Sequence, residues 1–136
     1  MFLLDTNVIY ELRRPETADA KVANWASNVP LSSIFLSAIT ILEIEFGALS
    51  IDRRDKAQGK ILRAWIDDQI LPSFDGRILP IDAAVALRCA RLRVPDPRAE
   101  RDSLIAATAL VHGLTLVTRN VADFAPTQAW VLNPWE

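Results

Sequence analysis

Short apolar runs alternate along this chain with longer stretches in which apolar residues recur at helical spacing. Five runs have the length and composition of strands that are buried on both faces: residues 2–4, 34–36, 78–81, 114–118 and 130–132. The stretches between them that predict helices are residues 22–29, 57–66, 85–92 and 103–112, the last ended by Gly113. This alternation predicts an α/β fold of three layers, with a mostly parallel sheet of about five strands between helices.

Length and composition limit the chain to one domain. Its 136 residues, of which 51% are hydrophobic, suffice for one well-buried domain and are too few for two ordinary ones, so we expect a single domain over residues 1–136. No apolar stretch is long enough to span a membrane and no signal peptide precedes the first strand, so we expect a cytoplasmic protein without a membrane partner. The single cysteine, Cys89, fits a reducing compartment, and with one histidine the chain cannot form a Cys/His zinc site.

Four acidic residues stand where the predicted strands end or the following helices begin. Asp5 ends the first strand, Glu43 follows the second, Asp102 begins the helix that leads to the fourth, and Asp123 follows the fourth. Because the carboxyl ends of parallel strands meet at one edge of a sheet, we expect all four carboxylates at that edge, where open α/β sheets bind ligands. Clustered carboxylates suit a hard divalent cation.

The same acids have a second interpretation, as helix caps. Asp and Glu are favoured at helix starts because they accept hydrogen bonds from free N–H groups and oppose the helix dipole. Thr40-x-x-Glu43 matches a capping box, and Asp102 stands where an N-cap would. For Glu43, Asp102 and Asp123 taken singly, both interpretations remain open. Asp5 differs because it ends a buried strand, and a buried carboxylate needs a cation or several hydrogen-bond donors.

The positions of the basic residues say more about nucleic-acid binding than the net charge of the chain does. The net charge of −2 argues against a strongly basic nucleic-acid-binding surface. Twelve of the fifteen basic residues are arginine, several of them clustered, and the planar arginine fork suits phosphate. Each cluster taken alone is better interpreted as a solvated helix face than as a phosphate-binding site.

Four motifs, in order, resemble those of PIN-domain ribonucleases. They are Leu4-Asp5-Thr6-Asn7; Leu36-Ser37-Ala38-Ile39-Thr40 running to Glu43; Asp102 with Leu104-Ile105-Ala106-Ala107-Thr108-Ala109; and Leu116-Val117-Thr118-Arg119-Asn120 running to Asp123-Phe124. Within this family the chain resembles the VapC toxins of bacterial toxin–antitoxin pairs. The segments Gly76-Arg77-Ile78-Leu79-Pro80 and Asn133-Pro134-Trp135 resemble the FitB branch of that group.

The resemblance implies a Mg²⁺-dependent endoribonuclease with a PIN-like three-layer α/β/α sandwich. Asp5, Glu43, Asp102 and Asp123 correspond to the family's catalytic acids, which hold Mg²⁺, with Mn²⁺ as a substitute. Relatives differ at the fourth position, where Asn120 is the alternative to Asp123. A metal-activated water would then hydrolyse the RNA phosphodiester bond, leaving a 5′-phosphate and a 3′-hydroxyl.

Three polar residues of these motifs are expected beside the acids. Thr6, Asn7 and Thr118 would fix the rotamers of the carboxylates or donate a hydrogen bond to a phosphate of the substrate. Asn120 would supply a neutral oxygen if it replaces Asp123.

The resemblance also implies partners. A cognate antitoxin with a DNA-binding domain would block the site by inserting an arginine or lysine, and DNA would be contacted only through the antitoxin. We further expect a homodimer and a higher toxin–antitoxin assembly, with an antitoxin helix in an apolar groove formed by the early helices. Trp25, Trp65, Ile61 and Ile66 are candidates for that groove or for the dimer contact, although core burial is the favoured interpretation for each taken singly.

Two rival functions start from the same residues. A phosphohydrolase or receiver domain would use Asp5 as a covalent phosphate acceptor, but Asn7 replaces the second acid of the Asp-x-Asp motif and no lysine stands near the end of a later strand. The other rival is a FitB-like scaffold subunit of a DNA-bound regulatory complex with little nuclease activity. Metal-dependent cleavage of RNA distinguishes it from the nuclease.

Overall fold

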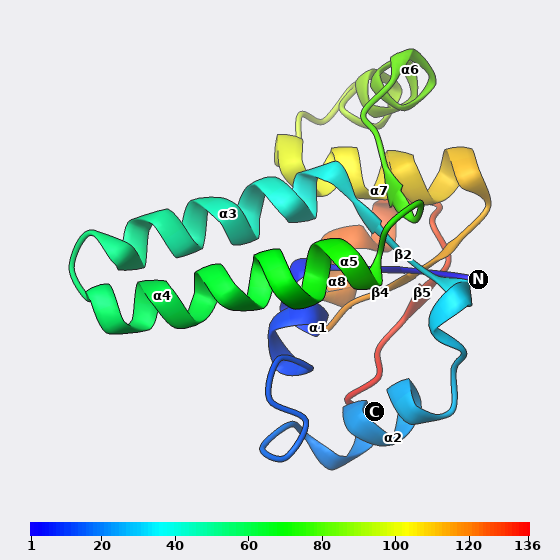
Figure 1. Cartoon of the computed structure of the whole chain (residues 1–136). Coiled ribbons are helices and arrows are strands. Elements are labelled where there is room, and N and C mark those ends of the chain that lie inside the picture. The colour runs from blue at the N-terminus through cyan, green and yellow to red at the C-terminus, as the bar shows by residue number, and fades with distance from the viewer.

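Five parallel strands form one sheet in the order β3-β2-β1-β4-β5 (Figure 1). The computed structural model describes the whole chain, residues 1–136. The strands are β1 (Phe2–Leu4), β2 (Ile34–Ser37), β3 (Ile78–Leu79), β4 (Thr115–Val117) and β5 (Val131–Leu132). The predicted α/β fold is confirmed, and the sheet is parallel throughout.

Three of the strands are shorter than predicted. Strand β3 stops before Pro80, which has no N–H to donate to a neighbouring strand. The hydrogen-bonded ladder between β4 and β5 continues one residue beyond the strands themselves, because the Thr118 N–H donates to the Leu132 carbonyl at 3.0 Å and the Leu116 N–H to the Trp130 carbonyl at 2.8 Å. The predictions for residues 114–118 and 130–132 are therefore too long at the ends and right in the centre.

Helices follow or precede every strand. They are α1 (Thr6–Glu11), α2 (Ala20–Ser27), α3 (Ala38–Asp52), α4 (Lys56–Ala64), α5 (Leu71–Ser73), α6 (Ala83–Leu92), α7 (Glu100–His112) and α8 (Val121–Phe124). A π-helical segment, Trp65–Ile70, joins α4 to α5, and 3₁₀ turns occupy Leu31–Ser33 and Ala125–Thr127. Helix α7 ends at Gly113, which adopts the left-handed conformation with φ +65°, as predicted.

Alternate side chains of the strands point into two separate cores. Leu4, Leu36 and Val117 face helices α1, α3 and α4, whereas Leu3 and Leu116 face helices α7 and α8. Helix α6 packs on the outside of α7 through Val85, Cys89 and Ala107 (Figure 1). The sheet therefore has helices on both sides, which confirms the predicted three layers.

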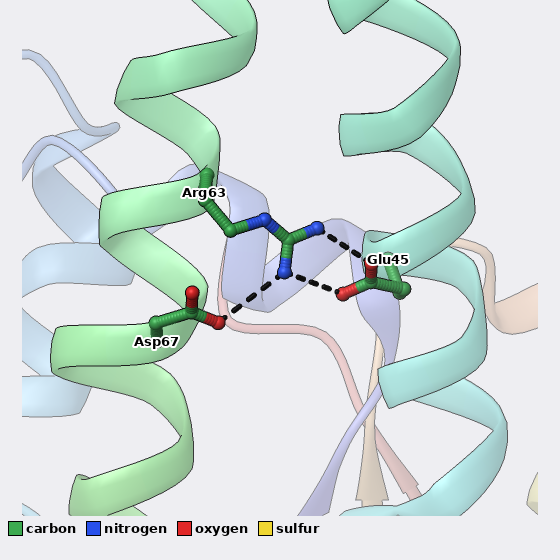
Figure 2. A network of polar contacts seen from close by, with 3 residues as sticks. All are labelled: Glu45, Arg63 and Asp67. Carbon is green, nitrogen blue, oxygen red and sulfur yellow. Dashed lines mark hydrogen bonds and ion pairs between the residues drawn. The ribbon is translucent and has the colours of Figure 1, made fainter.

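Helices α3 and α4 lie side by side as an antiparallel hairpin that extends away from the sheet (Figure 1). Gly59 of α4 permits the close approach, because a Cβ atom there would lie 2.6 Å from the Cα atom of Asp52 in α3. Figure 2 shows the polar tie between them: Arg63 of α4 donates to Glu45 of α3 at 2.9 Å and to Asp67 at 3.2 Å. These contacts fix the two helices against each other.

Helix α3 is predominantly apolar and leaves part of its apolar surface exposed. Ile44 and Ala48 are buried in the core, while Leu42, Phe46 and Leu49 are 47%, 62% and 56% exposed. The spacing of these three residues places them on one face of the helix. No helix of the protein combines the length and the apolar character that crossing a membrane requires.

The apolar residues expected at a partner surface separate into two groups. Trp65 and Ile66 belong to the core, which confirms the favoured interpretation for both, and Trp65 also lines a groove described below. Trp25 is half-buried and packs edge-on against Phe2, with ring centroids 5.3 Å apart. Ile61 is 49% exposed on α4 and remains available to a partner.

Candidate active site

Asp5 is a buried carboxylate at the carboxyl end of the central strand. It is 6% exposed and caps helix α1, where its Oδ1 accepts a hydrogen bond from the Thr6 N–H at 2.8 Å. Its Oδ2 accepts from the Thr118 hydroxyl at 2.8 Å and from the Asn7 side-chain amide at 3.2 Å. Burial raises the pKa of Asp5 although these three bonds oppose the shift, and the charge of Asp123 raises it further. No basic side chain forms an ion pair with Asp5.

Thr118 and Asn7 connect the segment that follows β1 to the segment that follows β4, next to the Asp5 carboxylate. The Thr118 hydroxyl, which donates to Asp5, accepts from the Asn120 N–H at 3.0 Å. The Asn7 side-chain oxygen accepts from the Arg119 N–H at 3.3 Å. The segment after β1 is thus tied to the segment after β4, and the orientation of Asp5 is set from both.

Glu43 lies on α3 and faces the same region. The Thr6 hydroxyl donates to its Oε1 at 3.0 Å. Burial raises the pKa of Glu43 first of all; the negative charges of Asp5 and Asp102 raise it further, while the Thr6 hydrogen bond and Arg101 act in the opposite direction. Glu43 therefore lies within electrostatic range of two of the other predicted acids.

The helix-cap interpretation is wrong for Glu43 and for Asp102. Helix α3 is capped by Ser37, whose Oγ accepts from the Ile39 N–H at 3.0 Å, so Glu43 stands in the second turn and not in a capping box. Helix α7 begins after Ala99, which makes no side-chain cap, and Asp102 is the third residue of the helix. Neither acid is held in place as a cap.

Asp102 and Asp123 complete the group from the other side of the sheet. Burial raises the pKa of Asp102, and the charges of Asp5 and Asp123 raise it further. Asp123 is exposed in the short helix α8. Asn120, its predicted alternative, is exposed and precedes that helix without a side-chain hydrogen bond to it. The four acids predicted from sequence thus affect one another electrostatically, and three of them have raised pKa values.

The donor set of this group suits a hard cation. The donors are carboxylate oxygens, and their mutual repulsion is relieved by a positive ion. No three of the side chains lie close enough to form a cage around an ion. Mg²⁺ does not require such a cage, because it keeps several water molecules and is commonly held by one or two carboxylates. Carboxylates that form no ion pair with a basic side chain of the protein are therefore suited to Mg²⁺.

Two residues near the acids were not identified from sequence. Arg101 stands beside Asp102 in α7 and acts on Glu43. Tyr10 lies one turn after Thr6 on α1, is 38% exposed and stacks on Trp65 with centroids 5.6 Å apart. Helical spacing from Thr6 would have indicated Tyr10, whereas nothing in the sequence distinguishes Arg101 from the other clustered arginines.

An apolar cavity of about 260 Å³ opens between α1, α2 and the π-helical segment. Leu12, Ala26, Val29, Ile70 and Phe74 are among its lining residues. The groove expected among the early helices therefore exists, although only Trp65 of the residues predicted for it contributes to the lining.

Comparison with known proteins gives the family. The family model described as the PIN domain matches residues 2–125 of this chain. The chain belongs to the PIN domain family. The parallel sheet with helices on both sides is the fold expected of a PIN domain from the sequence.

Individual PIN-domain relatives match over nearly the full length. Toxin FitB of Neisseria gonorrhoeae is 40% identical over 141 residues, covering 99% of this chain and 99% of the relative. VapC ribonuclease Y4jK of Sinorhizobium fredii is 33% identical and covers 100% of this chain and 99% of the relative. The solved structure of FitAB bound to the IR36 DNA fragment superposes with a TM-score of 0.89 at 38% identity, covering 100% of this chain and 96% of the matched one.

Proposed function

We propose that this PIN-domain protein is a Mg²⁺-dependent endoribonuclease and the toxin of a type II toxin–antitoxin pair. The observation that carries the proposal is the group of carboxylates at the sheet edge, whose central member, Asp5, is buried without a basic partner. Relatives named as a toxin and as a VapC ribonuclease support it over the full length of the chain. The reaction is hydrolysis of RNA phosphodiester bonds.

The protein's own residues orient the reacting groups. Thr118, Asn7 and the Thr6 N–H hold both oxygens of Asp5 in one orientation. The hydroxyl of Thr6 holds Oε1 of Glu43 and leaves Oε2 without a hydrogen bond from the protein. Because its pKa is raised, Glu43 is suited to accept a proton at Oε2 from the attacking water.

Asp102 and Asp123 lie nearer to solvent than Asp5 and complete the negative charge at the edge. We assign Asp5, Glu43, Asp102 and Asp123 to the holding of Mg²⁺, with Asn120 as the alternative to the fourth. When bound, Mg²⁺ supplies positive charge to the phosphate and makes a water molecule more acidic. Water as the nucleophile leaves a 5′-phosphate and a 3′-hydroxyl.

Cleavage of RNA by the purified chain tests the proposal. Fluorescently labelled single-stranded RNA of mixed sequence should be cut in Mg²⁺ or Mn²⁺ and not in EDTA. The new 5′ ends should be substrates for a 5′-phosphate-dependent exonuclease without prior phosphorylation. Cleavage that continues in EDTA, or no cleavage in either metal, contradicts the assignment.

We further propose an antitoxin as partner, with its own DNA-binding domain. The apolar cavity between α1 and α2 has room for an anchoring apolar side chain from an antitoxin helix. An arginine or lysine of the antitoxin would neutralise the acids and so block the site. The antitoxin would contact the DNA, because this chain carries a net charge of −2, which argues against a strongly basic surface for DNA. Both partners act in the cytoplasm, where RNA and the operator DNA are found.

The proposed homodimer is assigned to the hairpin. Leu42, Phe46 and Leu49 form the longest row of exposed apolar side chains on a single helix. Such a row is unfavourable in water, and a second copy covers it with the same surface in a two-fold symmetric contact. Larger assemblies then form as each copy binds its antitoxin.

A second candidate function is a scaffold in a DNA-bound regulatory complex with little nuclease activity. The match to FitAB bound to DNA favours it, because this chain aligns over its whole length with a protein of that complex. Absence of metal-dependent cleavage together with normal antitoxin binding would select it. A phosphate-accepting Asp5 is less suited to the structure, since the three lysines lie on α2 and α4 and both oxygens of Asp5 are engaged.

A further inference from the structure

Arg119 stands directly beside the acid group. It follows Thr118, whose hydroxyl donates to Asp5, and its own N–H donates to the side chain of Asn7 at 3.3 Å. The backbone at Arg119 is therefore fixed by the same contacts that orient Asp5. Its side chain is exposed.

The guanidinium of Arg119 is held by an aromatic ring. Its Cζ atom lies 5.1 Å from the centroid of Trp135, a cation–π contact between two segments that are 16 positions apart in sequence (135 − 119). The Trp135 side chain is half-buried against the core, and the backbone N–H of Trp135 donates to the side chain of Asn133 at 3.0 Å. The ring therefore forms a fixed surface on which the guanidinium rests.

Arg119 has no acidic partner in the protein. The three ion pairs of the structure involve Lys56 and Arg63 only. The guanidinium of Arg77, in contrast, donates hydrogen bonds to three backbone carbonyls. Arg119 is thus a positioned cation whose side-chain N–H groups make no hydrogen bond within the chain.

We propose that Arg119 binds a backbone phosphate of the RNA strand beside the acid group and that Trp135 positions its guanidinium. The inference rests on the proposed nuclease function. An RNA strand approaching Asp5, Asp102 and Asp123 is repelled by their charge, so a nearby cation is needed to hold the chain. The arginine fork binds phosphate oxygens in pairs, and stacking on an indole leaves its edge free to do so.

RNA binding by the full chain carrying Asp5→Asn, which removes cleavage, tests the contact. Fluorescein-labelled single-stranded RNA of mixed sequence is titrated over a series of salt concentrations. Adding Arg119→Gln should raise Kd by roughly tenfold, as expected for loss of a charged hydrogen bond. It should also reduce the slope of log Kd against log salt by about 0.7, the value for one phosphate contact on a single strand.

A matched control separates this contact from general charge loss. Arg54→Gln removes the same charge at the exposed turn between α3 and α4. It should leave both Kd and the salt slope unchanged. In the chain with Asp5 intact, Arg119→Gln should raise KM and leave kcat within about twofold, because the contact precedes the chemical step.

Variants of the ring test the positioning role. Trp135→Phe keeps an aromatic surface and should preserve both Kd and the salt slope, while Trp135→Leu should raise Kd towards the Arg119→Gln value. Because Trp135 contacts the core, melting curves are recorded for both, and Kd is compared at temperatures where each is folded. Equal effects of phenylalanine and leucine would overturn the positioning role.

Three further outcomes distinguish failure of the Arg119 inference from failure of the nuclease proposal. Unchanged Kd and salt slope in Arg119→Gln overturn the inference and leave the nuclease proposal intact if the parent cuts RNA. Loss of antitoxin affinity with normal RNA binding assigns Arg119 to the antitoxin surface instead and likewise overturns it. If the parent binds RNA but cuts none, the Arg119 effects on binding still report the phosphate contact, while the hydrolysis proposal fails.

Discussion

The pKa values of carboxylates are shifted in opposite directions at the sheet edge and on the α3–α4 hairpin. On the hairpin, Glu45 is 38% exposed and pairs with Arg63, whose hydrogen bonds lower the pKa of Glu45 (Figure 2). At the edge, Asp5 is 6% exposed, is held only by neutral donors and has a raised pKa. The charge of Glu45 is thus balanced by a basic side chain of the protein, whereas the charge of Asp5 is not.

The difference indicates which acids are structural and which are functional. An exposed ion pair such as Glu45 with Arg63 stabilises a fold modestly. Several acids that have raised pKa values and form no ion pair within the protein destabilise the fold, and such acids cluster at functional sites. The two regions should therefore respond differently to the same chemical change, an acid replaced by its amide.

Activity should show the largest contrast. Asp5→Asn and Asp102→Asn should each lower the rate of RNA cleavage by at least ~10²-fold, roughly what loss of a charge-stabilising group costs an enzyme. Glu43→Gln should also be severe, and Asp123→Asn milder because that side chain is exposed. Glu45→Gln is the matched control and should cut RNA at the parent rate. Undiminished cleavage by Asp5→Asn contradicts the assignment of the edge.

Assembly should depend on the hairpin and not on the edge. Phe46→Glu places a carboxylate in the exposed row of α3 and should raise the dissociation constant of the homodimer by at least ~10-fold, because burying an unpaired charge is unfavourable. Leu87→Glu on α6, where the side chain is 68% exposed, is the control and should leave the dimer intact. Light scattering across a concentration series measures both. Equal behaviour of the two variants removes α3 from the interface.

Stability of the metal-free protein should rise when an edge acid loses its charge. The raised pKa values of Asp5, Glu43 and Asp102 mean that the folded state binds protons more tightly than the unfolded state. Stability should fall as pH rises from about 4, the ordinary carboxyl range, through the raised values. Asp5→Asn should flatten this dependence and raise Tm at neutral pH by a few degrees, on the scale that ~1 kcal/mol produces.

Melting curves in EDTA from about pH 4 to about pH 8 measure this effect. A lower Tm for Asp5→Asn at neutral pH would show that its three hydrogen bonds outweigh the burial of its charge.

The smallest effect is expected on the hairpin, with the opposite sign. Because the pKa of Glu45 is lowered, its stabilisation is present above the ordinary carboxyl pKa and is lost as pH falls through the lowered value. Glu45→Gln should lower Tm at neutral pH by no more than about 2 °C and have no effect in acid. An increase in Tm would mean that Glu45 is unfavourable in the fold, as we propose for Asp5.

The sequence was sufficient to predict the parallel sheet, and it singled out four acids whose roles stay a prediction. Buried parallel strands are apolar on both faces, so their centres could be located, and Asp5 is conspicuous because a charge ends such a strand. The α3 surface could not be predicted, because that helix is predominantly apolar and its periodicity does not indicate a buried face. The helix predicted over residues 57–66 becomes π-helical at Trp65, and no local pattern reveals that change.

The contacts within the site were beyond sequence reasoning for a different reason. Thr118 and Asp5 are 113 positions apart, and the stacking of Arg119 on Trp135 joins two loops. Hydrogen bonds between distant segments depend on the strand register, which the predicted strand ends did not fix. The turn of α3 that carries Glu43 was misplaced because Ser37 and Thr40 can both cap a helix.

Thermal melting with and without Mg²⁺ tests the central claim most directly, because it needs neither RNA nor an antitoxin. A cation held by the edge acids binds the folded state only, so Mg²⁺ should raise Tm of the parent and of Glu45→Gln by the same amount. Asp5→Asn and Asp102→Asn should show no Mg²⁺-dependent increase. If Mg²⁺ leaves the parent unchanged, or stabilises Asp5→Asn as much as the parent, the edge carboxylates do not form the metal site and the account is wrong.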